Sequence, residues 1–340
     1  MHMRFFKNIF SFSMIPLFVT SCASIPEQQP PAWITTDVHF VYNETDYLSS
    51  IGDGISEDLA KYDALNKLSQ YFDTKVRSEG IALRTTAGSS ISASSVQTIS
   101  VKSDTDLFCV EYDKYYDKKQ KKYYCAAFIN RSKAWERYEP KVAQAQKKFM
   151  AEYNAAFGEM EELKKVIRIK RCFSPASEYL SQLDYAHSLY PVGAAAYEKD
   201  RDIIAGLEED LFSTRESITM GIEVIGDKDN KIKGTLTQII GNNQGFRLVS
   251  GKSGDYFVRA VVEKNDVTHH EDYDVITAEP RLSVEILKGA ECIFPYNKGL
   301  NKISAFNPAV IDKKMYGGFV DLLERDFADE MNKALERWCK

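Results

Sequence analysis

The sequence predicts an α+β protein in which two small domains, each with a helix on an antiparallel sheet, are separated by an α-helical hairpin or bundle. Aromatic and β-branched runs flank a polar turn within residues 107–129, which is the pattern of a β-hairpin. Residues 134–216 are rich in Ala, Glu, Lys and Gln and show helical periodicity. Residues 217–340 alternate strand-like and helix-like segments, as expected for a two-layer α+β sandwich.

Residues 1–21 are expected to form a lipoprotein signal peptide. Arg4 and Lys7 precede a short apolar segment that ends in small residues, and this order is typical of a secretion signal. The segment is too short for a transmembrane helix, which needs about 20 apolar residues. The residues Val19-Thr20-Ser21-Cys22 resemble the lipobox of bacterial lipoprotein precursors. In that family the chain is cut before the cysteine, whose thiol and new amine are acylated.

The lipobox resemblance implies that Cys22 is the lipid-attachment residue. An ordinary signal peptide cut nearby, with an incidental cysteine, is the alternative. Each buried methylene contributes about 0.8 kcal/mol, so two or three acyl chains such as palmitate would hold the protein stably at a membrane. Ala23 and Ser24 follow Cys22, without an aspartate that would suggest retention at an inner membrane. In a cell with two membranes this resembles a signal for the outer membrane, with the protein facing the periplasm.

Residues 22–32 are expected to form a tether between the lipid and the folded body. The segment contains Pro26, Pro30 and Pro31, and proline-rich spacers extend by about 3.1 Å per residue. The body should therefore lie about 30 Å or less from the bilayer surface.

The first domain is expected over residues 33–133 and begins with a strand and a helix. Residues 47–51 form a short strand candidate, and Gly52-Asp53-Gly54 is interpreted as a turn. A helix from near residue 56 to residue 78 follows, and Gly80 is its expected end. Small and apolar residues recur at helical spacing on one face, and the first two would let the helix approach a sheet closely: Ala60, Ala64, Leu68, Phe72 and Val76.

The second half of this domain contains the clearest hairpin of the chain. Residues 81–105, rich in Ser and Thr, could be an extended strand or a mobile excursion. Strands are then predicted at residues 107–116 and 122–129, around the charged turn 117–121. The four lysines at the hairpin tip could contact anionic headgroups or a partner, although charge runs usually only face water.

Five cysteines follow Cys22, and none of them shows the close spacing of a metal or redox motif: Cys109, Cys125, Cys172, Cys292 and Cys339. An odd number leaves at least one thiol free. Cys109 and Cys125 could form a disulfide only if they lie directly opposite each other, with the hairpin loop centred on Asp117. Buried, inert thiols are the favoured alternative.

The first domain contains four short motifs in a defined order and spacing: Pro31-Ala32-Trp33, Gly52-Asp53-Gly54 before the helix, Tyr115-Tyr116-Asp117-Lys118-Lys119, and Tyr123 to Arg131. In this order they resemble the LPP-twenty-like family of bacterial envelope lipoproteins over about residues 31–135. The resemblance implies a small α/β unit with a helix on an antiparallel sheet. Such domains occur in envelope lipoproteins and in proteins that build rings or disks around flagellar motors. The resemblance brings no catalytic residues, and it implies attachment and assembly.

Residues 134–216 are expected to form a helical hairpin or small bundle. One long helix is predicted over about residues 141–170, where apolar residues follow one stripe. Ser174-Pro175 has the pattern of a cap followed by a first helical residue, and the second helix would end at Tyr190-Pro191. Residues 193–212 offer a third helix. A stripe of this kind is usually core, so we expect no haem or metal there.

Residues 217–340 are expected to form the second α+β domain. A helix at about residues 232–240 and a final amphipathic helix from about Pro308 to Trp338 would cover its sheet. Strands are predicted at residues 218–225, 246–249, 256–262, 281–287 and 291–294.

Candidate chemistry is sparse. The cluster His269-His270-Glu271-Asp272 resembles metal ligands, but adjacent histidines in an extended segment point in opposite directions, so a metal site is not expected. Gly52-Asp53-Gly54 lacks the third glycine and the lysine of a nucleotide-binding loop. We find no motif of a catalytic nucleophile or carboxylate pair, and therefore predict no catalytic residue and no cofactor.

The net charge argues against nucleic acid as a partner. Loss of residues 1–21 would remove two of the 44 basic residues and none of the 49 acidic ones, which leaves a net charge of −7. Nucleic-acid binding requires clustered Lys and Arg. We therefore expect no nucleic-acid contact.

These observations predict a non-enzymatic, membrane-anchored lipoprotein of the cell envelope, with a structural or assembly role through protein partners or self-association. A periplasmic lipoprotein that binds a small molecule or glycan, in a groove between the helical segment and either sheet, is the alternative. An enzyme would need His187, His269 or His270 beside a carboxylate at an open cavity.

Overall fold

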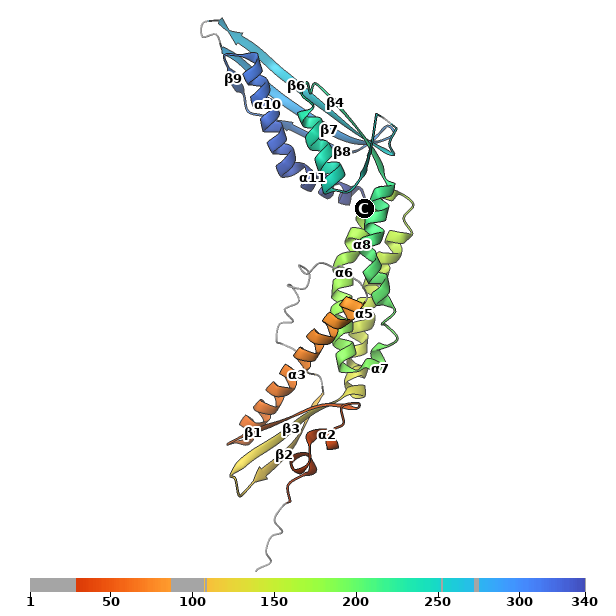
Figure 1. Cartoon of the computed structure of the whole chain (residues 1–340), viewed down its shortest axis with the longest axis vertical. Coiled ribbons are helices and arrows are strands. Elements are labelled where there is room, and N and C mark those ends of the chain that lie inside the picture. Colours follow the sequence, from red (N-terminus) through yellow and green to blue (C-terminus); the bar gives the residue numbers. More distant parts are fainter. Residues whose placement is uncertain (1–28, 87–106, 108, 252, 272–274, 340) are drawn as a thin grey trace, which may run out of the picture.

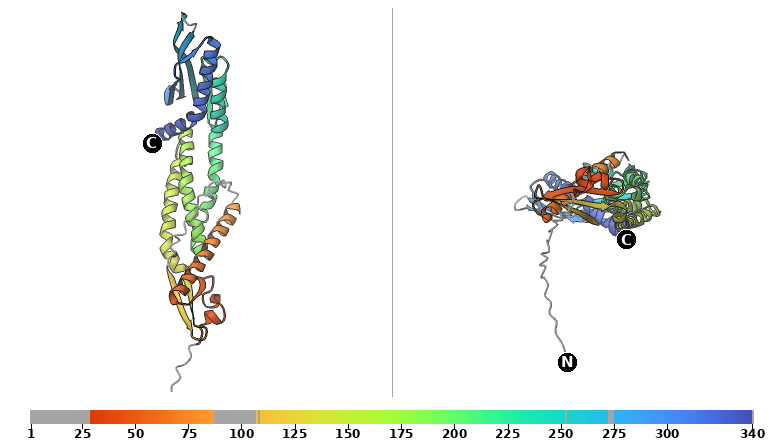
Figure 2. Two further views of the ribbon diagram at one scale, coloured as in Figure 1. Left: turned by 90° about the vertical axis from the view of Figure 1, so that its left-hand side faces the viewer. Right: turned by 90° about the horizontal axis from the view of Figure 1, so that it is seen from below.

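The computed structural model describes residues 29–86, 107, 109–251, 253–271 and 275–339. These residues form an elongated molecule with three parts along its long axis (Figure 1, Figure 2). A small sheet lies at one end, a helical bundle in the middle and a larger sheet at the other end. Helices and strands are both abundant, so the expected α+β class is confirmed.

The small sheet has three antiparallel strands in the order β1 (Tyr47–Gly54), β3 (Lys122–Asn130) and β2 (Val110–Asp117). Helix α3 (Glu57–Thr86) packs on one face. The short helices α1 (Ala32–Thr35) and α2 (Val38–Val41) cover the other face. Side chains alternate between the two faces along each strand, so both sides of this sheet contribute to a core. The predicted helix on an antiparallel sheet is confirmed, with a second layer of short helices added.

Small residues bring β1 and α3 into backbone contact. Ala60 and Ala64 are fully buried, and a Cβ atom at Gly52 would lie 2.0 Å from the Ala64 nitrogen. The Ser50 hydroxyl also donates to the Ala64 carbonyl at 2.6 Å. The close approach expected from the two alanines is confirmed. The turn expected at residues 52–54 is wrong, because these residues complete β1, where glycine is required for contact with the helix.

Helix α3 continues to Thr86, past the end predicted at Gly80. A single glycine inside a helix costs only about 1 kcal/mol relative to alanine, which is too little to end a helix of 30 residues. Residues 81–86 are therefore helical, and the rest of the segment 81–105 lies outside the described residues.

The β2–β3 hairpin pairs Asp117 with Lys122, so its loop is centred between residues 119 and 120. The loop centre at residue 117 that a disulfide would require is therefore not present. Lys114, and not Cys109, lies opposite Cys125, and both cysteines are free thiols. Burial raises the pKa of the Cys125 thiol, as expected for an inert buried cysteine.

The middle of the molecule is a bundle built from α5 (Arg131–Phe157), α6 (Glu162–Leu189), α7 (Pro191–Ala194) and α8 (Asp200–Ser217). The single helix predicted over residues 141–170 is wrong, because the chain reverses between Gly158 and Glu161. The Glu161 carboxylate accepts a hydrogen bond from the Lys164 amide at 2.8 Å and so caps α6. The helices on either side of this break pack against each other.

The helix start predicted at Ser174-Pro175 is also wrong, since Pro175 lies inside α6. Proline in a helix interior costs about 3 kcal/mol. The stripe of buried apolar residues on α6 nevertheless continues on both sides of Pro175, from Val166 and Ile169 to Ala176 and Tyr179. Packing of this stripe outweighs the local preference. The predicted end of the helix at Tyr190-Pro191 is confirmed.

The larger sheet has the strand order β5-β4-β6-β7-β8, with β9 paired to β7. Strand β4 runs parallel to β5 and β6, and the remaining pairs are antiparallel. The sheet is therefore mixed, and the antiparallel sheet predicted from the sequence is wrong. The strands are β4 (Thr219–Ile225), β5 (Arg247–Val249), β6 (Tyr256–His270), β7 (Val275–Lys288), β8 (Glu291–Gly299) and β9 (Ile303–Ala305).

Helices pack on one face of this sheet (Figure 1). Helix α9 (Lys231–Thr237) continues into a π-helical segment (Gln238–Asn243) and connects β4 to β5. A crossover of this kind returns the chain to the end of the sheet at which the first strand began. The two strands that it joins therefore run parallel. The predicted final helix is confirmed as one helical run of α10 (Pro308–Leu322), a π-helical segment (Leu323–Phe327) and α11 (Ala328–Trp338).

Two buried cores join the three parts. The first runs from the small sheet into the bundle, where the rings of Phe72 and Tyr185 pack edge to face at 4.7 Å. The second fills the larger domain and includes Leu163, Val166 and Ile167 from the start of α6. Both junctions are thus packed with side chains. In the part of the chain that the structure describes, no helix combines the length and the apolar character needed to cross a membrane.

Candidate tether-end contact site

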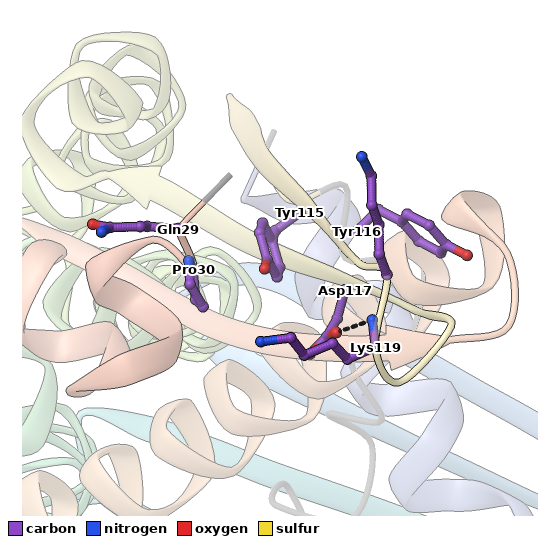
Figure 3. Close-up of a pocket in the computed structure, with 7 residues that line it drawn as sticks. Gln29, Pro30, Tyr115, Tyr116, Asp117 and Lys119 are labelled. Atoms are coloured by element: carbon purple, nitrogen blue, oxygen red, sulfur yellow. Dashed lines mark hydrogen bonds between the residues drawn. The ribbon is translucent and has the colours of Figure 1, made fainter. Parts of the chain in front are cut away.

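A cleft lies at the end of the molecule where the described chain begins (Figure 3). Its volume is about 260 Å³, and it is lined by Gln29, Pro30, Tyr115, Tyr116, Asp117, Lys118 and Lys119. The first two residues belong to the predicted tether, and the others to the end of β2 and the hairpin loop. The side chains of Tyr115 and Lys119 are directed toward Gln29 and Pro30, while the Tyr116 ring points away from them (Figure 3).

The hairpin tip, residues 117–122, is held in place by its own side chains. The Asp117 carboxylate accepts hydrogen bonds from the backbone amides of Lys119 and Gln120 at 2.8 and 3.0 Å. The Tyr124 hydroxyl donates to the Gln120 side chain at 2.8 Å. Lys121 has a φ of +52°, a left-handed conformation that is typical of tight turns. The tip is therefore an ordered loop.

The hairpin end carries a local excess of positive charge. Five lysines and one aspartate lie between residues 114 and 122. Lys114 pairs with Glu57 at the start of α3 at 2.5 Å, and Lys122 pairs with Asp53 of β1 at 2.6 Å. Hydrogen bonds to these carboxylates raise the pKa of both lysines. The side chains of Lys118, Lys119 and Lys121 are exposed at the tip.

Exposed apolar side chains lie at the same end of the sheet. Gly54 pairs with Tyr123, which places Ile55 and the start of α3 beside the hairpin. Ile55 is 83% exposed, Leu59 50% and Tyr116 41%. We use the name tether-end surface for Ile55, Leu59 and Tyr116 together with Lys118, Lys119 and Lys121. This set combines cations with apolar and aromatic groups, which is the chemistry of a contact with an anionic, partly apolar ligand.

Only part of this site is predictable from the sequence. Cys22 lies outside the described residues, so its lipidation stays a prediction. The run of lysines at the tip indicates a possible contact from the sequence alone. The sequence does not indicate that Ile55 and Leu59 belong to the same site, or that a cleft lies at Gln29. The missing signal is the pairing of β1 with β3, because isolated exposed apolar residues are common and carry no information in the sequence.

The candidate metal ligands do not converge in the described part of the chain. His269 and His270 are exposed at the end of β6, where they pair with Ile276 and Val275 of β7. Asp272 lies outside the described residues. Among the residues that the structure describes, no three His, Cys, Asp or Glu side chains are grouped so that they could hold a metal ion.

A buried ionic network surrounds His187 in the bundle. His187 Nδ1 lies 3.1 Å from Glu198 Oε1, and Arg201 donates to Glu198 at 2.5 Å and to Asp184 at 2.8 Å. Arg201 and Asp184 are only 7% and 4% exposed. Nearby, the Asp200 carboxylate accepts from Tyr179 and Gln146 at 2.8 and 2.7 Å. The network joins α6 to α8, and its residues are not among those that line the cleft at the tether end.

This network makes a testable prediction about pH. Burial opposes ionisation of Glu198, but hydrogen bonds from His187 and Arg201 outweigh it and lower the pKa of this carboxyl. A lowered pKa contributes stability that is complete above the unfolded value of about 4.3 and is lost as the pH falls through the folded value. Urea unfolding measured between about pH 7 and pH 3 should show a shallower acid loss for Glu198→Gln. A similar acid loss in Glu198→Gln and the wild type would contradict this assignment.

No family model and no curated protein sequence matches the chain. A solved structure of the secreted protein HP1454 from the human pathogen Helicobacter pylori is similar over 85% of this chain and 98% of its own, with 14% sequence identity and a TM-score of 0.33. A similarity of this size carries no argument about function.

Proposed function

We propose that this protein is a non-enzymatic lipoprotein of the cell envelope, anchored through Cys22, with a structural or assembly role. The observation that carries the proposal is the position of Gln29 at one end of an elongated molecule. A lipid on Cys22, seven residues before Gln29, would hold this end near a membrane and the larger α+β domain at the far end. The predicted signal peptide and lipobox, and the resemblance of residues 31–135 to LPP-twenty-like lipoproteins, support the same function.

The bundle supports a role as a spacer. Helices α5 and α6 contain 27 and 28 residues, and each is therefore about 40 Å long at a rise of 1.5 Å per residue. The two cores make the bundle continuous with both sheets, and the buried network around Arg201 joins α6 to α8 within it. A stiff body of this kind suits a protein that presents one domain to partners at a distance from the membrane.

The alternative, a small-molecule or glycan binder with its site in a groove between the bundle and a sheet, receives less support. Phe72 and Tyr185 fill the junction with the small sheet, and Leu163 and Ile167 fill the junction with the larger domain. A ligand at either junction would have to displace buried core side chains.

Anchoring is tested with a lipid label in cells. Radiolabelled palmitate should enter the wild-type protein, and Cys22→Ala should lose the label and leave the membrane fraction in a high-salt wash, because single cysteines carry this attachment. Cys292→Ala is the matched control, since Cys292 is an exposed free thiol far from the tether, and it should keep both the label and the membrane fraction. Label in the Cys22→Ala protein, or membrane binding that a high-salt wash leaves unchanged, would overturn the anchoring.

The assembly role is tested separately by crosslinking in intact cells. We expect the wild-type protein to crosslink to a protein partner or to a second copy of itself. Purification from detergent-solubilised envelopes with neither a partner nor self-association would overturn this role while leaving the anchoring intact.

A further inference from the structure

We propose that the tether-end surface binds anionic phospholipid headgroups, as a second membrane contact beside the lipid on Cys22. The inference rests on the proposed anchoring for its location, and it assigns a partner to a surface built from the hairpin tip and the start of α3. A lipid anchor alone leaves a protein free to rotate about its tether. A second contact would set the orientation of the long axis.

The length of the tether places this surface within reach of the bilayer. Gln29 is seven residues after Cys22, and a segment of this length spans about 20 Å when extended. Gln29 and Pro30 line the cleft together with Tyr115 and Lys119. The hairpin tip shares this cleft with Gln29, so an extended tether would hold it about 20 Å from the headgroups. A shorter, bent tether would bring it closer.

The charge of the tip is opposite to that of the rest of the protein. The whole chain has a net charge of −5, which an anionic membrane would repel. Salt screens charges beyond about 8 Å, so the local charge decides the contact. Asp53 and Glu57 are already paired with Lys122 and Lys114. The Asp117 carboxylate is directed at backbone amides of its own loop. Residues 114–122 carry five lysines and one aspartate, and Lys118, Lys119 and Lys121 are the exposed part of this positive charge.

The apolar members of the surface fit the interfacial region of a bilayer. Ile55 and Leu59 are exposed at the end of β1 and the start of α3, and Tyr116 is exposed on the hairpin. Tyrosine is enriched at membrane–water interfaces, and lysines combined with apolar side chains are typical of surfaces that bind anionic lipid.

Vesicle binding tests the proposal independently of acylation. The mature chain with Cys22→Ala is mixed with vesicles of phosphatidylcholine, with and without phosphatidylglycerol, and the bound fraction is measured by sedimentation. We expect binding only to the anionic vesicles, weakened by salt. Each lysine near an anionic surface contributes about fivefold in affinity, so Lys118→Glu, Lys119→Glu and Lys121→Glu together should reduce binding on the order of 100-fold.

A charge-matched control separates the surface from net charge. Lys147→Glu, Lys302→Glu and Lys313→Glu change exposed lysines of the bundle and the larger domain by the same total charge, and this variant should bind as the parent does. Ile55→Ser should weaken binding severalfold with little change in its salt dependence. Equal binding to neutral and anionic vesicles, or equal loss in the two triple variants, would overturn the proposal. So would capture of a protein, and of no lipid, by a photocrosslinker placed at residue 118. None of these outcomes depends on whether Cys22 is acylated.

Discussion

Replacing Gly52 with valine is expected to lower the free energy of unfolding by about 3 kcal/mol or more, at the upper end of what overpacked sites show. A Cβ atom at Gly52 would lie 2.0 Å from the Ala64 nitrogen, 2.4 Å from the Ala60 carbonyl oxygen and 2.7 Å from the Ala64 Cα. These are backbone atoms of α3, which cannot rotate away. The helix would have to move off β1 and expose the core that Leu68 and Phe72 complete.

Urea unfolding, followed by circular dichroism, measures this effect. Gly234→Ala is the control, because a Cβ at Gly234 in α9 meets nothing within 4 Å, and alanine is better than glycine in a helix by about 0.5–1 kcal/mol. The control should therefore be as stable as the wild type or slightly more stable. A Gly52→Val protein that unfolds at the wild-type urea concentration would mean that β1 and α3 do not touch as described.

Replacing Arg201 with methionine is expected to cost about 3–5 kcal/mol, the usual effect of removing one partner of a buried ion pair. Arg201 holds Asp184 at 2.8 Å and Glu198 at 2.5 Å, in a site where Asp184 is only 4% exposed. The methionine fills much of the volume but leaves carboxylates without their cation in a poorly solvated place. The contact between α6 and α8 should weaken first.

Two comparisons test this account of Arg201. Lys148→Ala removes an exposed pair with Glu178 in the same bundle, and such pairs contribute about 0–1 kcal/mol. The double variant Arg201→Met with Asp184→Leu removes both charges and should recover much of the lost stability. If the double variant is as unstable as the sum of its parts, the loss comes from packing and not from the uncompensated charge.

Most of the individual elements could be predicted because their signals are local. The β2–β3 hairpin follows from aromatic and β-branched runs around a charged turn, and the final helix from apolar residues at helical spacing. The errors occurred where local rules compete with packing. Pro175 suggested a helix start, yet it lies inside α6 because the buried stripe continues across it. Gly52 suggested a turn, yet it is the point where a strand touches a helix.

The candidate site was less predictable than the fold. Its lysines lie close together in the sequence, but Ile55 and Leu59 are separated from Lys118 by about 60 residues and come to the same end of the sheet only through the pairing of β1 with β3. The network of Arg201 joins side chains from two helices and had no motif that marked it. Both features depend on contacts between distant segments, which a single sequence does not display.

Composition and periodicity were thus sufficient for the α+β class and for most helices and strands, and the prediction that Cys22 carries a lipid follows from its resemblance to a lipobox. Tertiary contacts alone decided that β4 runs parallel to its neighbours, that α6 passes through Pro175, and that apolar and cationic groups meet at one end of the molecule. The physical reason is that propensity and hydrophobic spacing act within a few residues, whereas strand pairing and core packing join residues far apart in the chain.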